Sequence, residues 1–223
     1  MCSGQSVRTQ EELNQLSLLD AAQTAVGIQL RYAQAGTGMA SAAMAGARDC
    51  ETLRHYPARD VSDAVAGTRF YYHAHPSQRY PRDEHGHFHL FGYGLGRNGS
   101  GASGPDFFHL AGLSLDAKGQ ALRWFTTNRW VTGEHWYAAD RIVKMLPQFE
   151  VRTHGRLAPV ATWLSAMVRL FAPQIAAMVR QRDTVMAPHI ARLGREAALE
   201  DRKLDVVTEC PAALAQHIRQ IGL

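Results

Sequence analysis

Apolar positions follow a helical spacing near both ends of the chain and alternate in its middle. Thr9 and Glu12 form a capping box, and an apolar stripe follows at three- and four-residue spacing: Leu13, Leu16, Leu19, Ala22 or Gln23, Val26, Leu30 and Ala33. This pattern predicts a helix over residues 9–36. The alanine-rich residues 39–55 predict a second helix, which Pro57 stops because proline disfavours the helical conformation in the residue before it.

The central part of the chain, residues 66–128, predicts a β-sheet. Four segments are aromatic and alternating: TRFYYHAH, HGHFHLFGY, FFHLAGLSL and ALRWFTT. Segments of this kind are typical of strands. The turn-forming residues 116–119, DAKG, separate the third segment from the fourth, and such short links favour antiparallel pairing.

Helical spacing returns after residue 132. Thr132 is a candidate N-cap, a long helix begins near Pro159 and is bent or broken at Pro173 and Pro188, and a short last helix begins at Pro211. We therefore expect one α+β domain over residues 1–223. Its central antiparallel sheet of about four strands (66–128) is packed by N-terminal helices (1–58) and C-terminal helices (132–223).

Composition narrows the class of protein. The chain has 223 residues, 46% hydrophobic and 20% charged, as in ordinary globular domains. Residues 157–179 are long and apolar, but Arg169 and their helical rhythm favour a buried helix over a membrane span. The three cysteines are far apart and no apolar signal opens the chain, so we expect a cytoplasmic protein with free thiols. The net charge of +4 is mild, and no nucleic-acid reading motif accompanies it.

Histidines supply the main chemical signal. Six of the eleven lie in the first three predicted strands: His73, His75, His85, His87, His89 and His109. Side chains alternate along a strand, so the first two share one face of their strand, as do the next three. If both sets point to the same side of neighbouring strands, four or five imidazoles converge. Neutral imidazole suits Zn, Cu, Fe and Ni, so the pattern predicts a transition-metal site.

Carboxylates could complete this site. Asp83 and Glu84 precede the histidine run, and Glu134 lies further along the chain. Two histidines and one such carboxylate would form a facial set of ligands with open positions for substrate or oxygen. Glu134 and Asp140 could instead orient ligand histidines. The catalytic candidates are thus His87, Glu84 and Glu134.

A second interpretation comes from HGHFHLF, residues 85–91. This stretch resembles the His-φ-His-φ-His-φ-φ motif of the histidine triad hydrolases and transferases. The resemblance implies that His87 attacks a phosphate with help from His85 and His89. Gly86 departs from the motif, and more than half of the chain follows it, whereas in that family the motif lies near the end of the domain.

A broader resemblance covers most of the chain. The segments FYYHAH, EHGHFHLF, GLSLDAKG and WFTTNRWVTGE are similar to those of a family of bacterial proteins of unknown function. That family brings no established activity. Its last segment draws attention to Asn128, Arg129 and Trp130, which join a predicted strand to a helix and could bind a small-molecule substrate. Turn formation and core packing would account for the same three residues.

The sequence as a whole favours a metal-dependent enzyme. An iron or copper oxidoreductase is slightly preferred over a zinc hydrolase, because an all-nitrogen or nitrogen-plus-carboxylate set leaves positions open. The alternatives are a triad-like nucleotidyl or phosphate hydrolase or transferase, and a non-enzymatic metal- or ligand-binding accessory protein. No feature of the sequence determines the oligomeric state.

Overall fold

A computed structural model describes residues 10–47, 49–74, 83–93 and 107–223. Its strands form one antiparallel sheet whose spatial order is the order along the chain, from β1 to β6. The strands are β1 (Tyr56–Asp63), β2 (Thr68–His73), β3 (Glu84–Tyr93), β4 (Phe107–Asp116), β5 (Ala121–Thr127) and β6 (Val206–Pro211).

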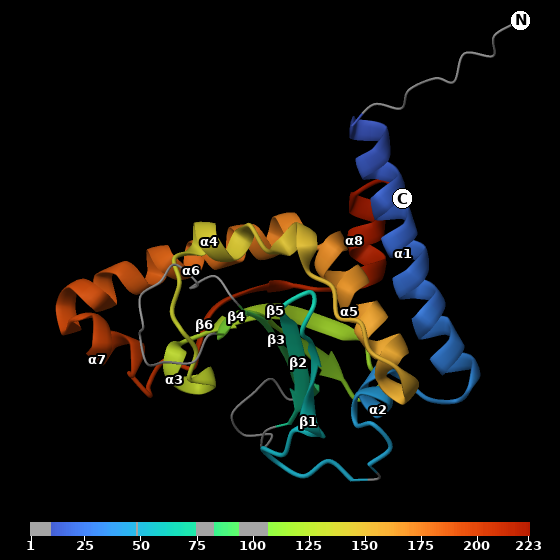
Figure 1. Ribbon diagram of the computed structural model, residues 1–223, viewed down its shortest axis with the longest axis horizontal. Coiled ribbons are helices and arrows are strands. Elements are labelled where there is room, and N and C mark those ends of the chain that lie inside the picture. Colours follow the sequence, from blue (N-terminus) through green and yellow to red (C-terminus); the bar gives the residue numbers. More distant parts are fainter. Residues whose placement is uncertain (1–9, 48, 75–82, 94–106) are drawn as a thin grey trace, which may run out of the picture.

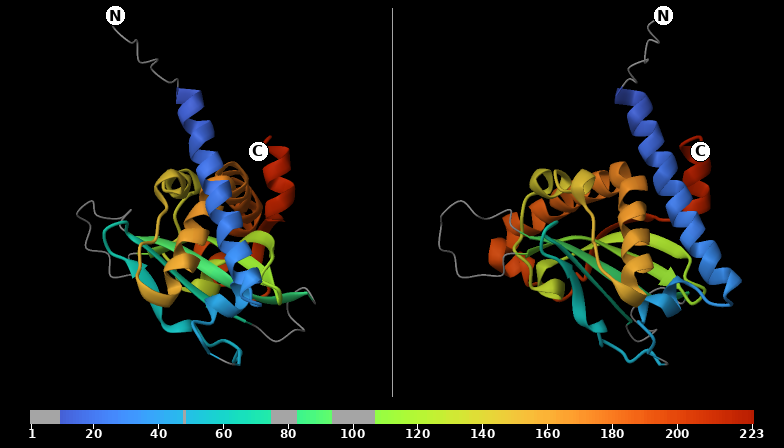
Figure 2. Two further views of the ribbon diagram at one scale, coloured as in Figure 1. Left: turned by 90° about the vertical axis from the view of Figure 1, so that its right-hand side faces the viewer. Right: turned by 45° about the vertical axis from the view of Figure 1, so that its right-hand side comes forward.

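Helices flank this sheet in the sequence and cover one of its faces (Figure 1). They are α1 (Gln10–Gln34), α2 (Met39–Ala43), α3 (Arg129–Thr132), α4 (Ala139–Val143), α5 (Ala158–Leu170), α6 (Ala172–Leu193), α7 (Arg195–Leu199) and α8 (Leu214–Gln220), with short 3-10 turns at Leu146–Gln148 and Gly155–Leu157. In both views of Figure 2, α1 and α8 lie side by side at one end of the molecule.

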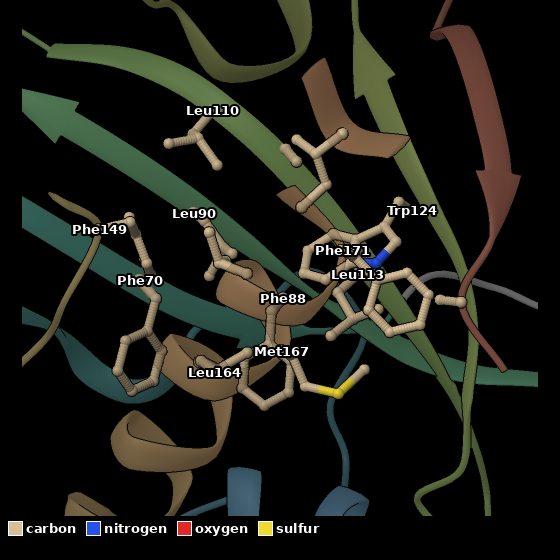
Figure 3. Close-up of a cluster of buried hydrophobic side chains, with 14 of the residues drawn as sticks. Phe70, Phe88, Leu90, Leu110, Leu113, Trp124, Phe149, Leu164, Met167 and Phe171 are labelled. Carbon is tan, nitrogen blue, oxygen red and sulfur yellow. The ribbon is translucent and has the colours of Figure 1, made fainter. Parts of the chain in front are cut away.

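The main core lies between the sheet and helices α5 and α6. Phe88 on β3 packs on Trp163 of α5, with ring centroids 6.3 Å apart, and Trp124 on β5 packs on Phe171 at the junction of α5 and α6. All four side chains are buried. Figure 3 shows how aromatic and aliphatic side chains of this cluster interdigitate. Burial of this apolar surface fixes which face of each strand points inward.

Several sequence predictions are confirmed. The first helix, the four central strands and their antiparallel pairing are present, and Gly119 closes the turn by donating its N–H to the Asp116 carbonyl. The long C-terminal helix is interrupted near Pro173, where α5 and α6 meet at 75°. Within the described residues, no single helix is long and apolar enough to cross a membrane. Helices α5 and α6 reach the necessary length and apolar composition only when the bent pair is taken together.

The prediction of a second helix over residues 39–55 was wrong for most of that range. Helix α2 ends at Ala43 because Ala45 and Gly46 adopt positive φ angles of 55° and 93°, which a right-handed helix cannot continue. The chain then enters β1, a strand that the sequence analysis did not expect. Its hairpin to β2 is closed by Asp63, whose carboxylate accepts backbone N–H groups.

Two further predictions fail in the C-terminal half. Thr132 ends helix α3, because Gly133 follows in the left-handed conformation, and so Thr132 does not begin a helix. Pro188 lies inside α6, which continues through it. Strand β6 was also missed: VVTECP lies between helices and pairs with β5 at the edge of the sheet, giving six strands among the described residues where about four were expected.

Candidate metal centre

Three histidines converge on the sheet face opposite the main core. In the β2–β3 ladder His73 pairs with His87, and Tyr71 pairs with His89. The three imidazoles are buried, and each offers one ring nitrogen such that all three lie within 4.8 Å of one another. The Nε2 atoms of His73 and His87 are 2.9 Å apart. The predicted convergence of imidazoles from two strands is therefore present for these three residues.

Alternation along the two strands produces this arrangement. Tyr72 and Phe88 occupy the positions between the histidines, pair with each other across the strands and are buried in the main core. Because neighbouring residues of a strand point to opposite faces, anchoring this pair turns His73, His87 and His89 to the other side.

The spacing of the nitrogens is compatible with a single metal ion. Two imidazole nitrogens bound at about 2.0–2.1 Å lie about 2.9 Å apart when the bonds form a right angle and about 3.3 Å apart in a tetrahedral site. The 2.9 Å between His73 and His87 is also the length of a hydrogen bond between two imidazoles. The surroundings of the histidines help to decide between these two descriptions.

Glu84 orients His87. Its Oε1 lies 2.6 Å from His87 Nδ1, and its Oε2 lies 3.3 Å from Arg123. Burial by itself would raise the pKa of Glu84, but the hydrogen bond with His87 and the charge of Arg123 help to outweigh it, and the pKa is lowered. An ionised carboxylate only accepts hydrogen bonds, so Nδ1 of His87 carries the proton and Nε2 is the nitrogen that would ligate a metal. Carboxylate–histidine–metal arrangements have this form.

His109 has the corresponding position beside His89. Its Nε2 lies 2.9 Å from His89 Nδ1, and its Nδ1 lies 3.2 Å from the Thr127 hydroxyl. Burial lowers the pKa of His109 to about 3, and the Arg182 charge acts in the same direction, so the ring is neutral. A neutral His109 can accept the Nδ1 proton of His89, which leaves Nε2 as the nitrogen of His89 that would ligate a metal. His109 contacts a candidate ligand and lies outside the group of three.

The expectation that His85 shares a face with His87 and His89 was wrong. A β-bulge between Glu84 and Gly86 places an extra residue in β3, and such a residue interrupts the alternation. Nδ1 of His85 therefore lies 2.7 Å from the Tyr72 hydroxyl, next to the main core. The same bulge brings Glu84 to the histidine face. His75, another predicted ligand, lies outside the described residues.

Gly86 is required by close packing at the bulge. A Cβ atom there would lie 2.7 Å from both the His73 carbonyl oxygen and the Tyr72 hydroxyl. This explains why a glycine stands where the histidine triad motif has a bulky residue. The H-x-H-x-H spacing does not bring three imidazoles to one face of this strand.

Comparison with known proteins places the chain in a family. The family described as Domain of unknown function (DUF6969) matches residues 19–212. The chain belongs to the DUF6969 family. Among curated proteins and solved structures, none matches it. Membership agrees with the expected resemblance to an uncharacterised family, and the matched region contains all three histidines of the candidate metal centre.

Glu134, the second predicted carboxylate, supports the sheet beside His109. The β4–β5 ladder ends at Gly112 and does not reach His109. Oε2 of Glu134 accepts the backbone N–H of His109 in its place. Burial raises the pKa of Glu134 to about 8, against the opposing effects of the Arg182 charge and the His109 hydrogen bond. Glu134 therefore reaches His109 and lies outside the group of three histidines.

The three predicted substrate-binding residues connect β5 to the C-terminal segments. Asn128 caps α3 and donates to the Ala198 carbonyl, and Trp130 donates its indole N–H to the Leu204 carbonyl. Arg129 pairs with Glu196 and Glu200 and lines a surface pocket of about 490 Å³. Their use in substrate binding stays a prediction, whereas their contacts already account for their positions.

Sequence reasoning missed His55, which lies beside His73. Its ring stacks on Tyr71 at 3.7 Å and meets His73 edge-on at 5.7 Å, and its Nδ1 lies 3.2 Å from Asp60. Its position 18 residues before His73, outside the predicted strands, gave no signal. The unexpected strand β1, which begins at Tyr56, brings it to the edge of the histidine face.

Proposed function

We propose that this protein binds one transition-metal ion through His73, His87 and His89 and uses it as the centre of an enzyme active site. The observation that carries the proposal is the convergence of three buried imidazoles, two of which have their second ring nitrogen held by a neighbouring side chain. Metal-ligating histidines are oriented in this way, because the hydrogen bond fixes both the tautomer and the direction of the ring.

Burial supports a built site over an accidental cluster. The three imidazoles lie in an aromatic environment, with Tyr71 5.3 Å from His89 and Phe125 5.1 Å from His87, measured between ring centroids. Buried imidazoles need partners for their polar nitrogens. A bound cation would be shared by one nitrogen of each of the three rings.

Three protein ligands leave coordination positions for a substrate, which favours an enzyme over a closed structural site. An iron or copper oxidoreductase remains preferred to a zinc hydrolase. Both carboxylates named as catalytic candidates are engaged, Glu84 with His87 and Arg123 and Glu134 with the His109 backbone. Neutral imidazoles bind iron, copper and zinc alike. The preference for an oxidoreductase therefore rests on these two carboxylates, because their existing contacts do not place them to act as the acid or base of a hydrolase.

Metal analysis of protein purified without a histidine tag tests the binding. We expect about one equivalent of a transition metal after reconstitution, and its loss in His87→Ala and His89→Ala. His85→Ala is the matched control, since His85 lies on the other side of the same strand. Less than about a tenth of an equivalent in the wild-type protein would overturn the proposal. So would equal losses in the His85 and His87 variants.

A second measurement tests whether the metal is open to substrate. Nitric oxide added to the iron(II)-loaded protein, or azide added to the copper(II)-loaded protein, should change the electron paramagnetic resonance spectrum by occupying an open position. A bound metal whose spectrum responds to neither probe would contradict the enzyme proposal and identify a storage or transfer protein instead.

A further inference from the structure

Helix α1 buries a different face from the one that its leucine pattern predicts. The side chains packed in the core are Ala21, Ala22, Ala25 and Ile28, and the helix lies mainly against α5. By contrast, Leu16, Leu19 and Leu30 are 38%, 37% and 54% exposed. The helix thus carries a second apolar stripe whose three leucines stay partly exposed.

This stripe has the spacing of a coiled-coil seam. Leu16, Gln23 and Leu30 are seven residues apart, and Leu19 and Val26 each follow three residues after one of them. Alternating steps of three and four residues define the a and d positions of a heptad. We call these five residues the leucine seam. Val26 is partly buried against the main core, whereas the three leucines stay partly exposed, so core packing alone does not account for the seam.

The seam is complementary to a second copy of itself. In a parallel pair of α1 helices each leucine meets the same leucine, Val26 meets Val26, and Gln23 meets Gln23. A polar residue at one a position sets the register of such pairs, and the Gln23 amide can both donate and accept a hydrogen bond. The first turns of α1 extend beyond the rest of the molecule in Figures 1 and 2, so a second helix can approach them.

The charge of α1 argues against a membrane surface as the partner. The helix contains one basic residue, Arg31, and three acidic ones, Glu11, Glu12 and Asp20. Helices that lie on anionic membranes are rich in lysine and arginine on their polar face. The balance here would repel such a surface.

We propose that the leucine seam is the contact between two copies of this chain, which form a parallel, two-fold symmetric dimer. The seam spans about 21 Å, the rise of 14 helical residues. Stable interfaces bury about 1,200–2,000 Å² in total, and a pair of helices in contact over two heptads lies at or below the low end of that range. The dimer is therefore reversible and dissociates on dilution.

Sedimentation velocity of the untagged protein over a wide range of concentration tests the proposal. We expect the apparent mass to rise from monomer toward dimer, and Leu19→Glu or Leu30→Glu to abolish this rise with little change in melting temperature, since both side chains are partly exposed. Val65→Glu is the matched control, because Val65 is 90% exposed and lies in the β1–β2 turn. A monomer at every concentration, or a dimer that survives both seam substitutions, would overturn the proposal.

Cross-linking tests the register. In Gln23→Cys protein, mild oxidation should give a disulfide-linked dimer well above the amount formed by the wild-type chain with its native cysteines. A reversible dimer that gives no such cross-link would contradict the parallel pairing. Binding of the monomer to anionic vesicles through α1, abolished by Leu19→Glu, would assign the seam to a membrane and also refute a second copy as its partner.

Discussion

Glu84 should control metal affinity without touching the metal. Its side chain is 3% exposed, and Oε1 is 2.6 Å from His87 Nδ1, which is the length of a strong charge-assisted hydrogen bond. Loss of such a partner typically lowers metal affinity by about 10- to 100-fold, or about 1.4–2.7 kcal/mol. We expect Glu84→Gln to lie near the lower value, because the amide oxygen still accepts the His87 proton, and Glu84→Ala near the upper one.

Competition against a chelator of known affinity measures this change, with circular dichroism as the check on folding. Glu209→Gln is the control, because Glu209 pairs with the same Arg123 but is 56% exposed and does not contact a histidine. Its affinity should equal that of the wild type. If Glu84→Ala binds metal as tightly as the wild type, or if the Glu209 variant loses as much affinity as the Glu84 variants, the orienting role of Glu84 is refuted.

Three further outcomes are expected. His109→Leu should lower metal affinity about tenfold in the same competition assay, because His89 loses the partner of its Nδ1, and an unchanged affinity would contradict this role. Phe88→Ala should reduce the free energy of unfolding in urea by about 3–5 kcal/mol, since its ring is fully buried, and a loss below about 1 kcal/mol would contradict the packing. Asp63 accepts three backbone N–H groups, which lower its pKa below that of the unfolded chain. Its contribution to stability is therefore present above about pH 4 and lost as the pH falls through the lowered pKa. Asp63→Asn should reduce stability at neutral pH and flatten its decline in acid, and parallel pH profiles of the two proteins would disprove the contribution.

The sequence predicted the elements whose pattern is unambiguous. Alternating aromatic residues identified β2 to β5, and simple alternation placed His87 and His89 on one face of their strand. Strands β1 and β6 were not predictable in the same way. YPARDVSD is polar and begins next to a proline, and VVTECP is short and lies between helices, so their strand conformation depends on pairing with neighbours already in the sheet.

The histidine site was predicted only in part, because the sequence does not show where a strand is irregular. Alternation gives the face of a residue only while the strand stays regular, and the bulge at Glu84–Gly86 has no clear signature beyond one glycine. Consequently His85 was assigned to the wrong face, and the orienting contact of Glu84 with His87 was not foreseen, since the sequence offered Glu84 only as a possible metal ligand or catalytic group. The pairing of His89 with His109 required the β3–β4 register, which the chain alone does not reveal.

The bulge in β3 also determines which chemical groups the site contains. Flattening the bulge with every residue kept would restore regular alternation, so that the imidazole of His85 would share a face with His87 and the carboxylate of Glu84 would turn toward Tyr72. A centre with three histidines and a supporting anion would become one with four histidines and no such anion. Loss of one of residues 85 and 86 would instead leave Glu84 two positions before His87, so relatives of this chain with one residue fewer there would keep the supporting carboxylate on the histidine face.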